Sequence, residues 1–331
     1  MKNSRNGLRC AATLLCAAPM TCLAQSGAAH NAAAYPARPI RIVVPQSPGA
    51  STDFTARMIA QRLSDAFKQP VVVDNRPGAG TMIGTELVVR AAPDGHTLMV
   101  VASGITVNPS VYKRIPYDTA RDLAPITQLT RYSNLLAAHP AFAAKSLQDV
   151  LVLAKAKPAT LNYASAGLAS GTHMSMELLK TMTGIDLVHI PYTGGGPAAI
   201  AAIGGQTQLI IGTTVGVLPH VRSGRLRGIA VTTAARASVA PEIPTFAESG
   251  VPGYDHGPWN GMFAPARTPP AVITKIHAEV ARILQSPEAR KLLSNEGVEP
   301  VANPPDAFAA LMRAELDMWP KVVKAAGIKQ D

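Results

Sequence analysis

The sequence predicts an α/β protein with two lobes, each built on a mostly parallel β-sheet flanked by helices. Short runs rich in β-branched residues alternate with helical patterns along the chain, and glycine-rich turns separate them. The 331 residues are enough for two domains of ordinary size. The elements also fall into two groups, followed by a strand that returns to the first group.

The first 24 residues have the pattern of a secretory signal peptide. Lys2, Arg5 and Arg9 precede an apolar run, and small residues follow it up to Ala24. The apolar run is too short to span a membrane, and no later run approaches the ~20 apolar residues that a span requires. We therefore expect an exported protein that is soluble after cleavage.

Cysteine content and charge exclude several kinds of site. All three cysteines lie within the first 24 residues, so the rest of the chain can form no disulfide or thiolate metal site. Three of the 31 basic residues but none of the 21 acidic residues lie there too, which reduces the net charge from +10 to +7. The basic residues are scattered without interleaved aromatic residues, so we expect no nucleic-acid partner.

The unit at residues 40–67 organises the rest of the chain. A short apolar strand leads through a small polar turn into a helix with one apolar face. Ser51 or Thr52 is placed to cap this helix, and Asp53 falls in its first turn, where a carboxylate interacts favourably with the helix dipole. Gly49 leaves room for a ligand to approach the N–H groups at the helix start. The unit is therefore a candidate anion site.

The same arrangement recurs three times. Strands are expected at 71–73, 161–164 and 187–190, and each ends in a glycine-rich turn that opens a helix. In the last of these units, we expect Pro197 at the first helical position and Gly204 at the helix end. Strands that alternate with helices predict parallel sheets, in which ligands bind beyond the carboxyl ends of the strands.

The units divide between two lobes. Residues 35–132 are assigned to the first lobe and residues 133–258 to the second. The remaining segment, 259–331, begins with a strand that returns to the first lobe and continues with amphipathic helices through 272–284 and 308–319. A chain that leaves a lobe and returns to it makes a double hinge. Two lobes with facing helix N-termini would close on a small anion.

An ordered series of short motifs runs through nearly the whole chain after the signal peptide. It includes Pro39-Ile40-Arg41, Val73-Asp74-Asn75-Arg76-Pro77-Gly78-Ala79-Gly80, Ala92-Pro93-Asp94-Gly95, Tyr163-Ala164-Ser165 and Gly224-Arg225-Leu226-Arg227. The series resembles the substrate-binding proteins of tripartite tricarboxylate transporters, the Bug or TctC family. The resemblance implies a periplasmic, type II-like Venus-flytrap protein that captures a small carboxylate for membrane permease subunits. It implies no enzyme activity, cofactor or metal, and we expect a monomer.

In this family, backbone amides and hydroxyls of the turns hold one carboxylate group, partly through bridging waters. Carried over position by position, the resemblance implies contacts from both lobes. They are Ser47, Gly49, Ala50, Ser51, Thr52, Asp53, Gly78, Ala79, Gly80 and Thr81 in the first lobe, and Ser165, Ala166, Gly167, Thr172, Thr193, Gly194 and Thr213 in the second. His173 lies beside this set, where it would either donate to the ligand or simply pack in the protein.

The chain departs from the family pattern at four positions. Ala50 and Thr81 stand where the family usually has glycines, so each adds side-chain bulk. Gln208 and Gly212 stand where the family commonly has aspartates. Without an acidic group near Thr213, nothing offsets the desolvation of a ligand ammonium group. A plain di- or monocarboxylate is therefore favoured over an amino acid.

Other functions have less support. The glycines at 78–84 resemble a dinucleotide fingerprint, but their spacing differs by one residue. Ser165 lacks the Gly-x-Ser-x-Gly frame of a hydrolase, so a two-lobed periplasmic enzyme would need a nucleophile and base that do not stand out. The eight histidines are dispersed and do not form a metal-binding pattern. A sensor subunit stays open as an alternative, because sensing and transport both need only ligand-dependent closure.

Overall fold

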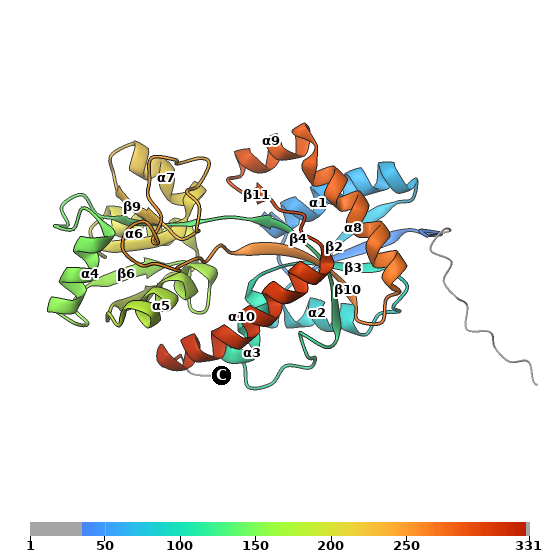
Figure 1. Ribbon diagram of the computed structural model, residues 1–331, viewed down its shortest axis with the longest axis horizontal. Coiled ribbons are helices and arrows are strands. Elements are labelled where there is room, and N and C mark those ends of the chain that lie inside the picture. The colour runs from blue at the N-terminus through green and yellow to red at the C-terminus, as the bar shows by residue number, and fades with distance from the viewer. Residues whose placement is uncertain (1–34, 50, 329–331) are drawn as a thin grey trace, which may run out of the picture.

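The computed structural model describes residues 35–49 and 51–328 of the chain. The predicted signal peptide and Ala50 lie outside these residues. Two β-sheets form, and helices cover them, so that the molecule has two lobes joined by crossing segments (Figure 1). None of the described helices is long and apolar enough to cross a membrane.

The sheet of the first lobe has six strands in the order β11-β4-β10-β3-β1-β2. The first three strands in sequence run parallel, whereas β10 is antiparallel to both of its neighbours. The strands are β1 (Ile40–Val44), β2 (Val71–Asn75), β3 (Thr97–Ala102), β4 (Leu123–Arg131), β10 (Trp259–Pro265) and β11 (Glu299–Pro300).

The sheet of the second lobe has five strands in the order β7-β6-β8-β5-β9. Strand β6 is parallel to β7 and β8, whereas β5 is antiparallel to β8 and β9. The strands are β5 (Asn134–Ala138), β6 (Asn162–Ser165), β7 (Val188–Pro191), β8 (Leu209–Thr213) and β9 (Arg227–Val231). In each sheet most strands run in one direction, as predicted. Strands β5 and β10, which enter directly from the opposite lobe, and the short β11 run against it.

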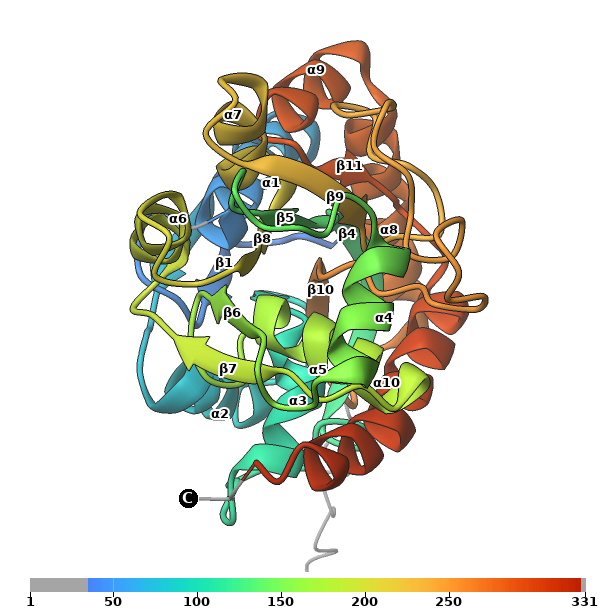
Figure 2. The same cartoon turned by 90° about the vertical axis from the view of Figure 1, so that its left-hand side faces the viewer.

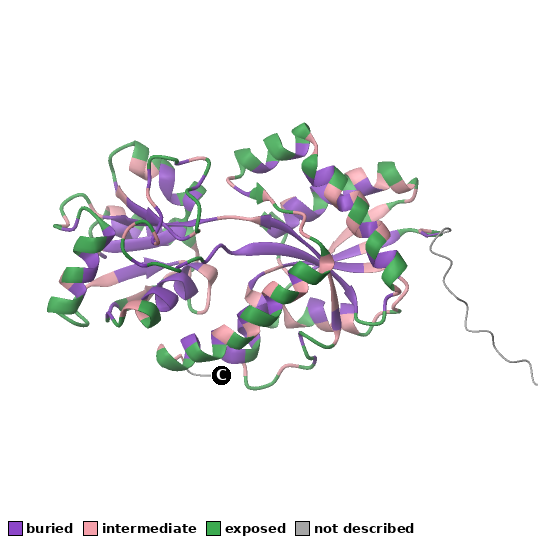
Figure 3. Ribbon diagram, in the orientation of Figure 1, coloured by how far each residue is buried: buried purple, intermediate pink, exposed green. Residues whose placement is uncertain are grey.

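Helices cover both faces of each sheet. One face of the first sheet packs against α1 and α8, and the other against α2, α3 and the start of α10. The second sheet is covered by α4 and α5 on one face and by α6 and α7 on the other. The central strands are accordingly buried along most of their length (Figure 3), whereas the residues of the outer strands β2, β7 and β11 are half-buried or exposed. The helices are α1 (Ser51–Phe67), α2 (Met82–Val89), α3 (Gly104–Val111), α4 (Leu147–Ala156), α5 (Gly171–Thr183), α6 (Gly195–Ile203), α7 (Thr214–Arg222), α8 (Pro270–Gln285), α9 (Pro287–Asn295) and α10 (Pro305–Ala325), and a 3-10 turn (Ala79–Thr81) precedes α2.

The C-terminal helix α10 joins the lobes. Phe308 packs in the core of the first lobe, whereas Trp319 and Val322 pack in the core of the second. Between them, the buried Glu315 accepts hydrogen bonds from Thr106 Oγ1 (2.7 Å) and Trp259 Nε1 (2.9 Å). The amphipathic pattern predicted the helix but not its contact with the second lobe, which the helix reaches by running from the middle of the first lobe to below the second (Figure 1).

Two details of the helix starts differ from the predictions. Pro197 is the third residue of α6 rather than the first, because the helix already begins at Gly195 after Gly194 as its N-cap. Proline is tolerated there since the first N–H groups of a helix have no intrahelical partner. Thr52 does not cap α1; its hydroxyl instead donates to Asn260 Oδ1 of the returning strand (2.8 Å).

Candidate functional site

The carboxyl ends of four strands meet at one edge of the first sheet. Strands β1, β2 and β3 are parallel, so their carboxyl ends share an edge. Strand β4 runs in the same direction, because β10 is antiparallel to both β3 and β4. Arg131, the last residue of β4, therefore lies at the edge where β1 leads into α1 and β2 leads into α2.

The corresponding edge of the second sheet faces this one. The carboxyl ends of β6, β7 and β8 share an edge, and Asn134, which opens β5, pairs with Thr213 at the end of β8. Only Tyr132 and Ser133 separate Arg131 from Asn134 in the chain. The two edges are thus joined by a two-residue connection, and Figure 2 views them from the side of the second lobe.

Helix N-termini line both edges. Helices α1 and α2 start at the first edge, and α5, α6 and α7 start at the second. The free N–H groups and the dipole of a helix N-terminus favour a negative charge. Facing helix starts therefore provide an electrostatically positive environment without a positively charged side chain.

Asp53 organises the first turn. Its carboxylate accepts hydrogen bonds from Gly49 N (3.0 Å), Arg57 Nε (3.0 Å) and Asn75 Nδ2 (2.9 Å), and the residue is only 4% exposed. Burial acts to raise its pKa, but these hydrogen bonds outweigh that effect and hold the pKa of Asp53 below its usual range. The carboxylate therefore fixes the turn after β1 against the end of β2.

The glycine turn after β2 has an unusual backbone. Ala79, Gly80 and Thr81 all have positive φ, at 44°, 61° and 80°. A Cβ at Gly80 would overlap the side chain of Tyr112, so only glycine fits there. Asn108 Nδ2 donates to Gly80 O (2.7 Å) and to Thr81 Oγ1 (3.2 Å). Thr81 stands where the family usually has a glycine, and its additional hydroxyl is therefore held by Asn108 of α3.

The turn after β6 is held by its own side chains. Ser165 Oγ accepts from Gly167 N (3.1 Å), and Thr172 Oγ1 accepts from Ala166 N (3.0 Å). Ser170 caps α5 by accepting from His173 N (3.2 Å). The N–H groups of Ala166 and Gly167 are thus engaged within the turn. The N–H groups that come before Met174 at the start of α5 have no intrahelical acceptor, because the first intrahelical hydrogen bond runs from Met174 N to Ser170 O.

Two stacked histidines lie beneath this turn. The rings of His173 and His189 are 3.7 Å apart and nearly parallel, and His189 Nε2 lies 2.6 Å from Ser165 Oγ. His173 is 2% exposed; its Nδ1 accepts from Ala169 N (3.0 Å), and its Nε2 lies 3.6 Å from Glu177 Oε1. Both ring nitrogens face protein atoms, which favours the packing role of His173 over donation to a ligand.

Charge in this cluster is balanced by Glu177. Burial acts to raise its pKa, but contacts with His173, Tyr163 and Lys180 outweigh burial and lower the pKa of Glu177. Burial, assisted by the proximity of His173, lowers the pKa of His189 to about 4, so His189 is neutral at pH 7. The Ser165–His189 pair is a serine and base that sequence inspection missed. Ser165 is 0% exposed, so no substrate atom reaches its hydroxyl in this arrangement.

The starts of α6 and α7 complete the second edge. Gly194 is the N-cap of α6, and Thr213 caps α7 by accepting from Gly216 N (3.3 Å). The next residue, Thr214, donates to Ser133 O (2.9 Å) and so ties α7 to the connection between the lobes.

The predicted site residues differ in how far they are exposed. Those exposed at the two edges are Ser47, Gly49, Ser51, Gly78, Ala79, Gly80, Thr193 and Thr213. Those that are half-buried are Thr81, Ala166, Gly167 and Gly194, and those that are buried and support the edges are Thr52, Asp53, Ser165, Thr172 and His173.

Asn134 is a residue of this edge that sequence inspection missed. It is fully buried, and its Nδ2 donates to Gly171 O (3.3 Å) and Ser175 Oγ (2.9 Å), while its Oδ1 has no partner among the described residues. A buried side-chain carbonyl oxygen normally accepts a hydrogen bond, so Asn134 Oδ1 is expected to bind a donor such as a water molecule. A polar residue opening the otherwise apolar strand β5 is the sequence signal that points to it.

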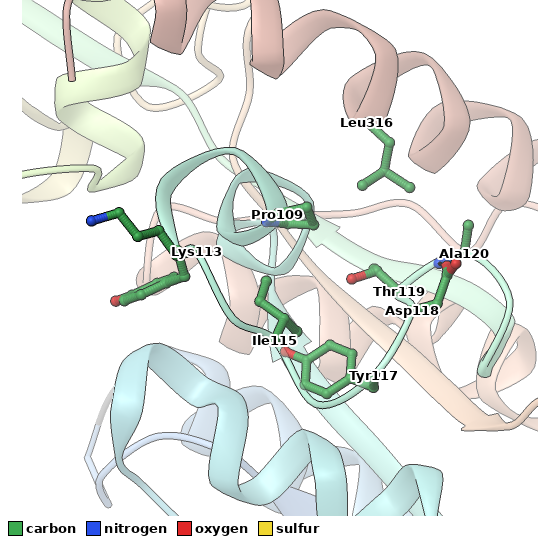
Figure 4. Close-up of a pocket in the computed structure, with 9 residues that line it drawn as sticks. Pro109, Lys113, Ile115, Tyr117, Asp118, Thr119, Ala120 and Leu316 are labelled. Atoms are coloured by element: carbon green, nitrogen blue, oxygen red, sulfur yellow. Dashed lines mark hydrogen bonds between the residues drawn. The ribbon is translucent and has the colours of Figure 1, made fainter. Parts of the chain in front are cut away.

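Cavities also occur away from these edges. One of about 350 Å³ lies between the segment after α3 and helix α10 (Figure 4). Tyr112 lies between this cavity and Gly80. Among the residues described, no group of three or more histidine, cysteine, aspartate or glutamate side chains is placed to hold a metal ion.

The comparison with protein families gives a match over most of the chain. Residues 55–328 match the model of the tripartite tricarboxylate transporter family receptor, TctC. The chain belongs to the TctC family. The Protein BugT of Bordetella pertussis is 36% identical over 301 residues, which cover 90% of this TctC chain and 92% of BugT.

Solved TctC-like structures share the fold. An R. palustris protein solved with adipate is 35% identical, has a TM-score of 0.74, and aligns over 90% of this chain and 100% of its own. MatC from Rhodopseudomonas palustris with bound malate is 32% identical, has a TM-score of 0.70, and aligns over 87% and 100%. The protein is thus a two-lobed, periplasmic-type solute-binding receptor.

Two departures from the TctC pattern have different structural meanings. A Cβ at Gly212 would lie 2.5 Å from Val217 Cγ2, so Val217 occupies the space that an acidic side chain would need beside Thr213. Gln208 precedes β8 at the opposite end of that strand, where it exchanges hydrogen bonds of 3.0 Å with Asn162. The residue at 208 therefore joins strands away from the facing edges, and only Gly212 bears on the candidate site.

Proposed function

We propose that this TctC receptor binds a small carboxylate between its lobes and delivers it to a membrane permease. The observation that carries the proposal is the arrangement of helix N-termini on two facing sheet edges, joined by the two-residue connection at Tyr132 and Ser133. Such helix ends recognise an anionic group through backbone N–H donors. The relatives solved with adipate and malate support the class of ligand.

The proposed ligand is a di- or monocarboxylate rather than an amino acid. An ammonium group needs a nearby anionic partner when it leaves water. Asp53 is the acidic residue at the turn after β1, and its carboxylate already accepts hydrogen bonds from Gly49, Arg57 and Asn75. Position 212 offers no acidic side chain and is closed by Val217. The turns therefore favour the carboxylate and disfavour a cationic substituent.

Capture is proposed to work by closure about a double hinge. With the predicted lobe boundaries at 132/133 and 258/259, one hinge would lie between β4 and β5 and the other before β10. Ligand in contact with both edges would stabilise the closed state, as in other hinge proteins. The same proposal, together with the receptor family, includes export to the periplasm, a permease as the recipient of the ligand and no catalytic activity.

The direct test is ligand binding by the mature protein. Native mass spectrometry of protein purified without refolding would reveal a retained molecule, and thermal shift with mono-, di- and tricarboxylates would extend the search. We expect a small carboxylate to bind and to raise the melting temperature. Absence of binding across the whole panel, or a retained nucleotide, would overturn the proposal.

A charge placed at a helix start tests the location. Gly195, the first residue of α6, lies outside the left-handed region, and a Cβ there would meet no atom within 4 Å. Gly195→Asp should weaken carboxylate binding at least tenfold by charge repulsion, while Gly195→Asn of nearly equal shape should have little effect. Gly195 suits this test better than Gly167, whose φ of 131° strains any side chain. Equal affinities of the two variants would remove α6 from the site.

A further inference from the structure

Two exposed aliphatic side chains stand on the facing edges. Ile83, in the first turn of α2, is 54% exposed, and Leu168, in the turn between β6 and α5, is 58% exposed. They come from opposite lobes, since α2 starts at the first edge and the turn after β6 lies at the second. Large aliphatic side chains with this exposure gain free energy when a partner removes them from water.

The side chain of Ile83 lies across the glycine turn of the first edge. A Cβ built on Gly78 would come within 2.6 Å of Ile83 Cδ1, so the missing side chain at Gly78 is what leaves room for Ile83. The exposed residues 78–80 thus have an aliphatic group directly beside their backbone. An anion bound at this turn would have its adjoining carbon atoms next to Ile83.

The charged side chains of the described turns are paired with other residues, so they are not available to contact the part of the ligand beyond its carboxylate. Asp53 is paired with Arg57, and Arg76 donates to Asp74 (3.0 Å). In the second lobe, residues 165–173 and 191–197 contain no acidic or basic residue except the buried His173. Ile83 and Leu168 are the most exposed large aliphatic side chains of these edges; Val215, in the first turn of α7, is less exposed at 36%.

We propose that Ile83 and Leu168 select a carboxylate whose body is an unsubstituted hydrocarbon chain, and that they disfavour hydroxylated carboxylates. The inference rests on the proposed function and adds the substrate class to it. A ligand hydroxyl next to these side chains would lose hydration without gaining a hydrogen bond. A methylene chain would instead be desolvated together with them.

The test compares adipate, which has an unsubstituted chain, with malate, which carries a hydroxyl, by isothermal titration calorimetry on the mature protein. Wild-type protein should bind adipate at least about tenfold more tightly than malate. Leu168→Asn and Ile83→Asn, which keep a similar size but add polarity, should each weaken adipate binding about tenfold and reduce the preference. The matched control is Val152→Asn on α4, where Val152 is 56% exposed, and it should bind as wild type does.

The outcomes separate the two proposals. Malate bound as tightly as adipate, or adipate affinity unchanged in both test variants, would overturn the inference and leave carboxylate capture standing. Failure of every carboxylate to bind wild-type protein would overturn the proposed function and the inference with it. Loss of adipate binding in Val152→Asn as well would also overturn the inference, because the effect would then not depend on the facing edges.

Discussion

Ser165 Oγ lies 2.6 Å from His189 Nε2, and this contact couples the turn after β6 to a half-buried, neutral imidazole. The two residues are 24 positions apart but sit on paired strands, β6 and β7. His189 in turn stacks on His173, whose Nδ1 accepts from Ala169 in the same turn. The turn is therefore held in part by contacts with two stacked imidazoles from its own helix and from the neighbouring strand.

The stability of the protein should fall on mild acidification. His189 and His256 have pKa values lowered to about 4, chiefly by burial, against 6.5 in the unfolded chain. Between these pH values the unfolded state binds more protons, so unfolding becomes easier as the pH falls from about 6.5 toward 4. Thermal melts at pH 7 and pH 5 check this, and we expect a lower melting temperature at pH 5.

The His189 share of this effect can be isolated. His189→Gln should show a smaller decrease between pH 7 and pH 5 than wild type, because one of the two imidazoles whose pKa is lowered to about 4 is absent. His139→Gln, outside the stacked pair, is the control and should keep the wild-type pH dependence. A His189→Gln profile parallel to that of wild type would show that this imidazole does not contribute.

Asp53 should matter for stability more than a simple helix-end charge would. Asp53→Asn removes an acceptor oxygen from the buried group that Gly49, Arg57 and Asn75 contact, and we expect a loss of about 1–3 kcal/mol in the free energy of unfolding. Urea denaturation measures it. Asp65→Asn on the exposed side of α1 should stay within about 0.5 kcal/mol of wild type. A stable Asp53→Asn variant with strongly reduced ligand affinity would instead make Asp53 a direct ligand contact.

Position 80 should require glycine for lack of space as well as for backbone conformation. Gly80 and Gly49 both have positive φ, but a Cβ at Gly80 would overlap Tyr112 whereas one at Gly49 would meet no atom within 4 Å. Gly80→Ala should therefore cost about 1–3 kcal/mol more than Gly49→Ala, measured by urea denaturation. Equal costs would mean that Tyr112 moves aside freely.

Helix α10 should stabilise the second lobe. Trp319 is 1% exposed, and its ring meets His256 edge-on at 5.1 Å. Trp319→Ala should lower the free energy of unfolding by about 3–5 kcal/mol, since truncating a fully buried aromatic residue leaves a cavity. Leu316→Ala, at a half-buried position on the same helix, should cost clearly less. Limited proteolysis should then cleave the second lobe of Trp319→Ala sooner than that of wild type.

The sequence alone was sufficient for the class of fold and for the position of the turns. The apolar strands and helical faces of β1, α1 and α5 are encoded by residue periodicity, and Gly184 ends α5 in the left-handed conformation as a glycine after a helix should. The family resemblance also followed from short motifs and is confirmed by the match over residues 55–328. These features are local, so neighbouring residues carry the information for them.

Only the tertiary structure decided which predicted residues face outward at the edges and which support them. Thr52 meets Asn260 across 208 positions of the chain, and His173 meets His189 from another strand. Likewise, the antiparallel entry of β5 and β10, and the reach of α10 into the second lobe, depend on how distant segments pair. Periodicity identifies an apolar face, but it does not specify the partner of that face, because many distant faces are chemically equivalent until the chain has folded.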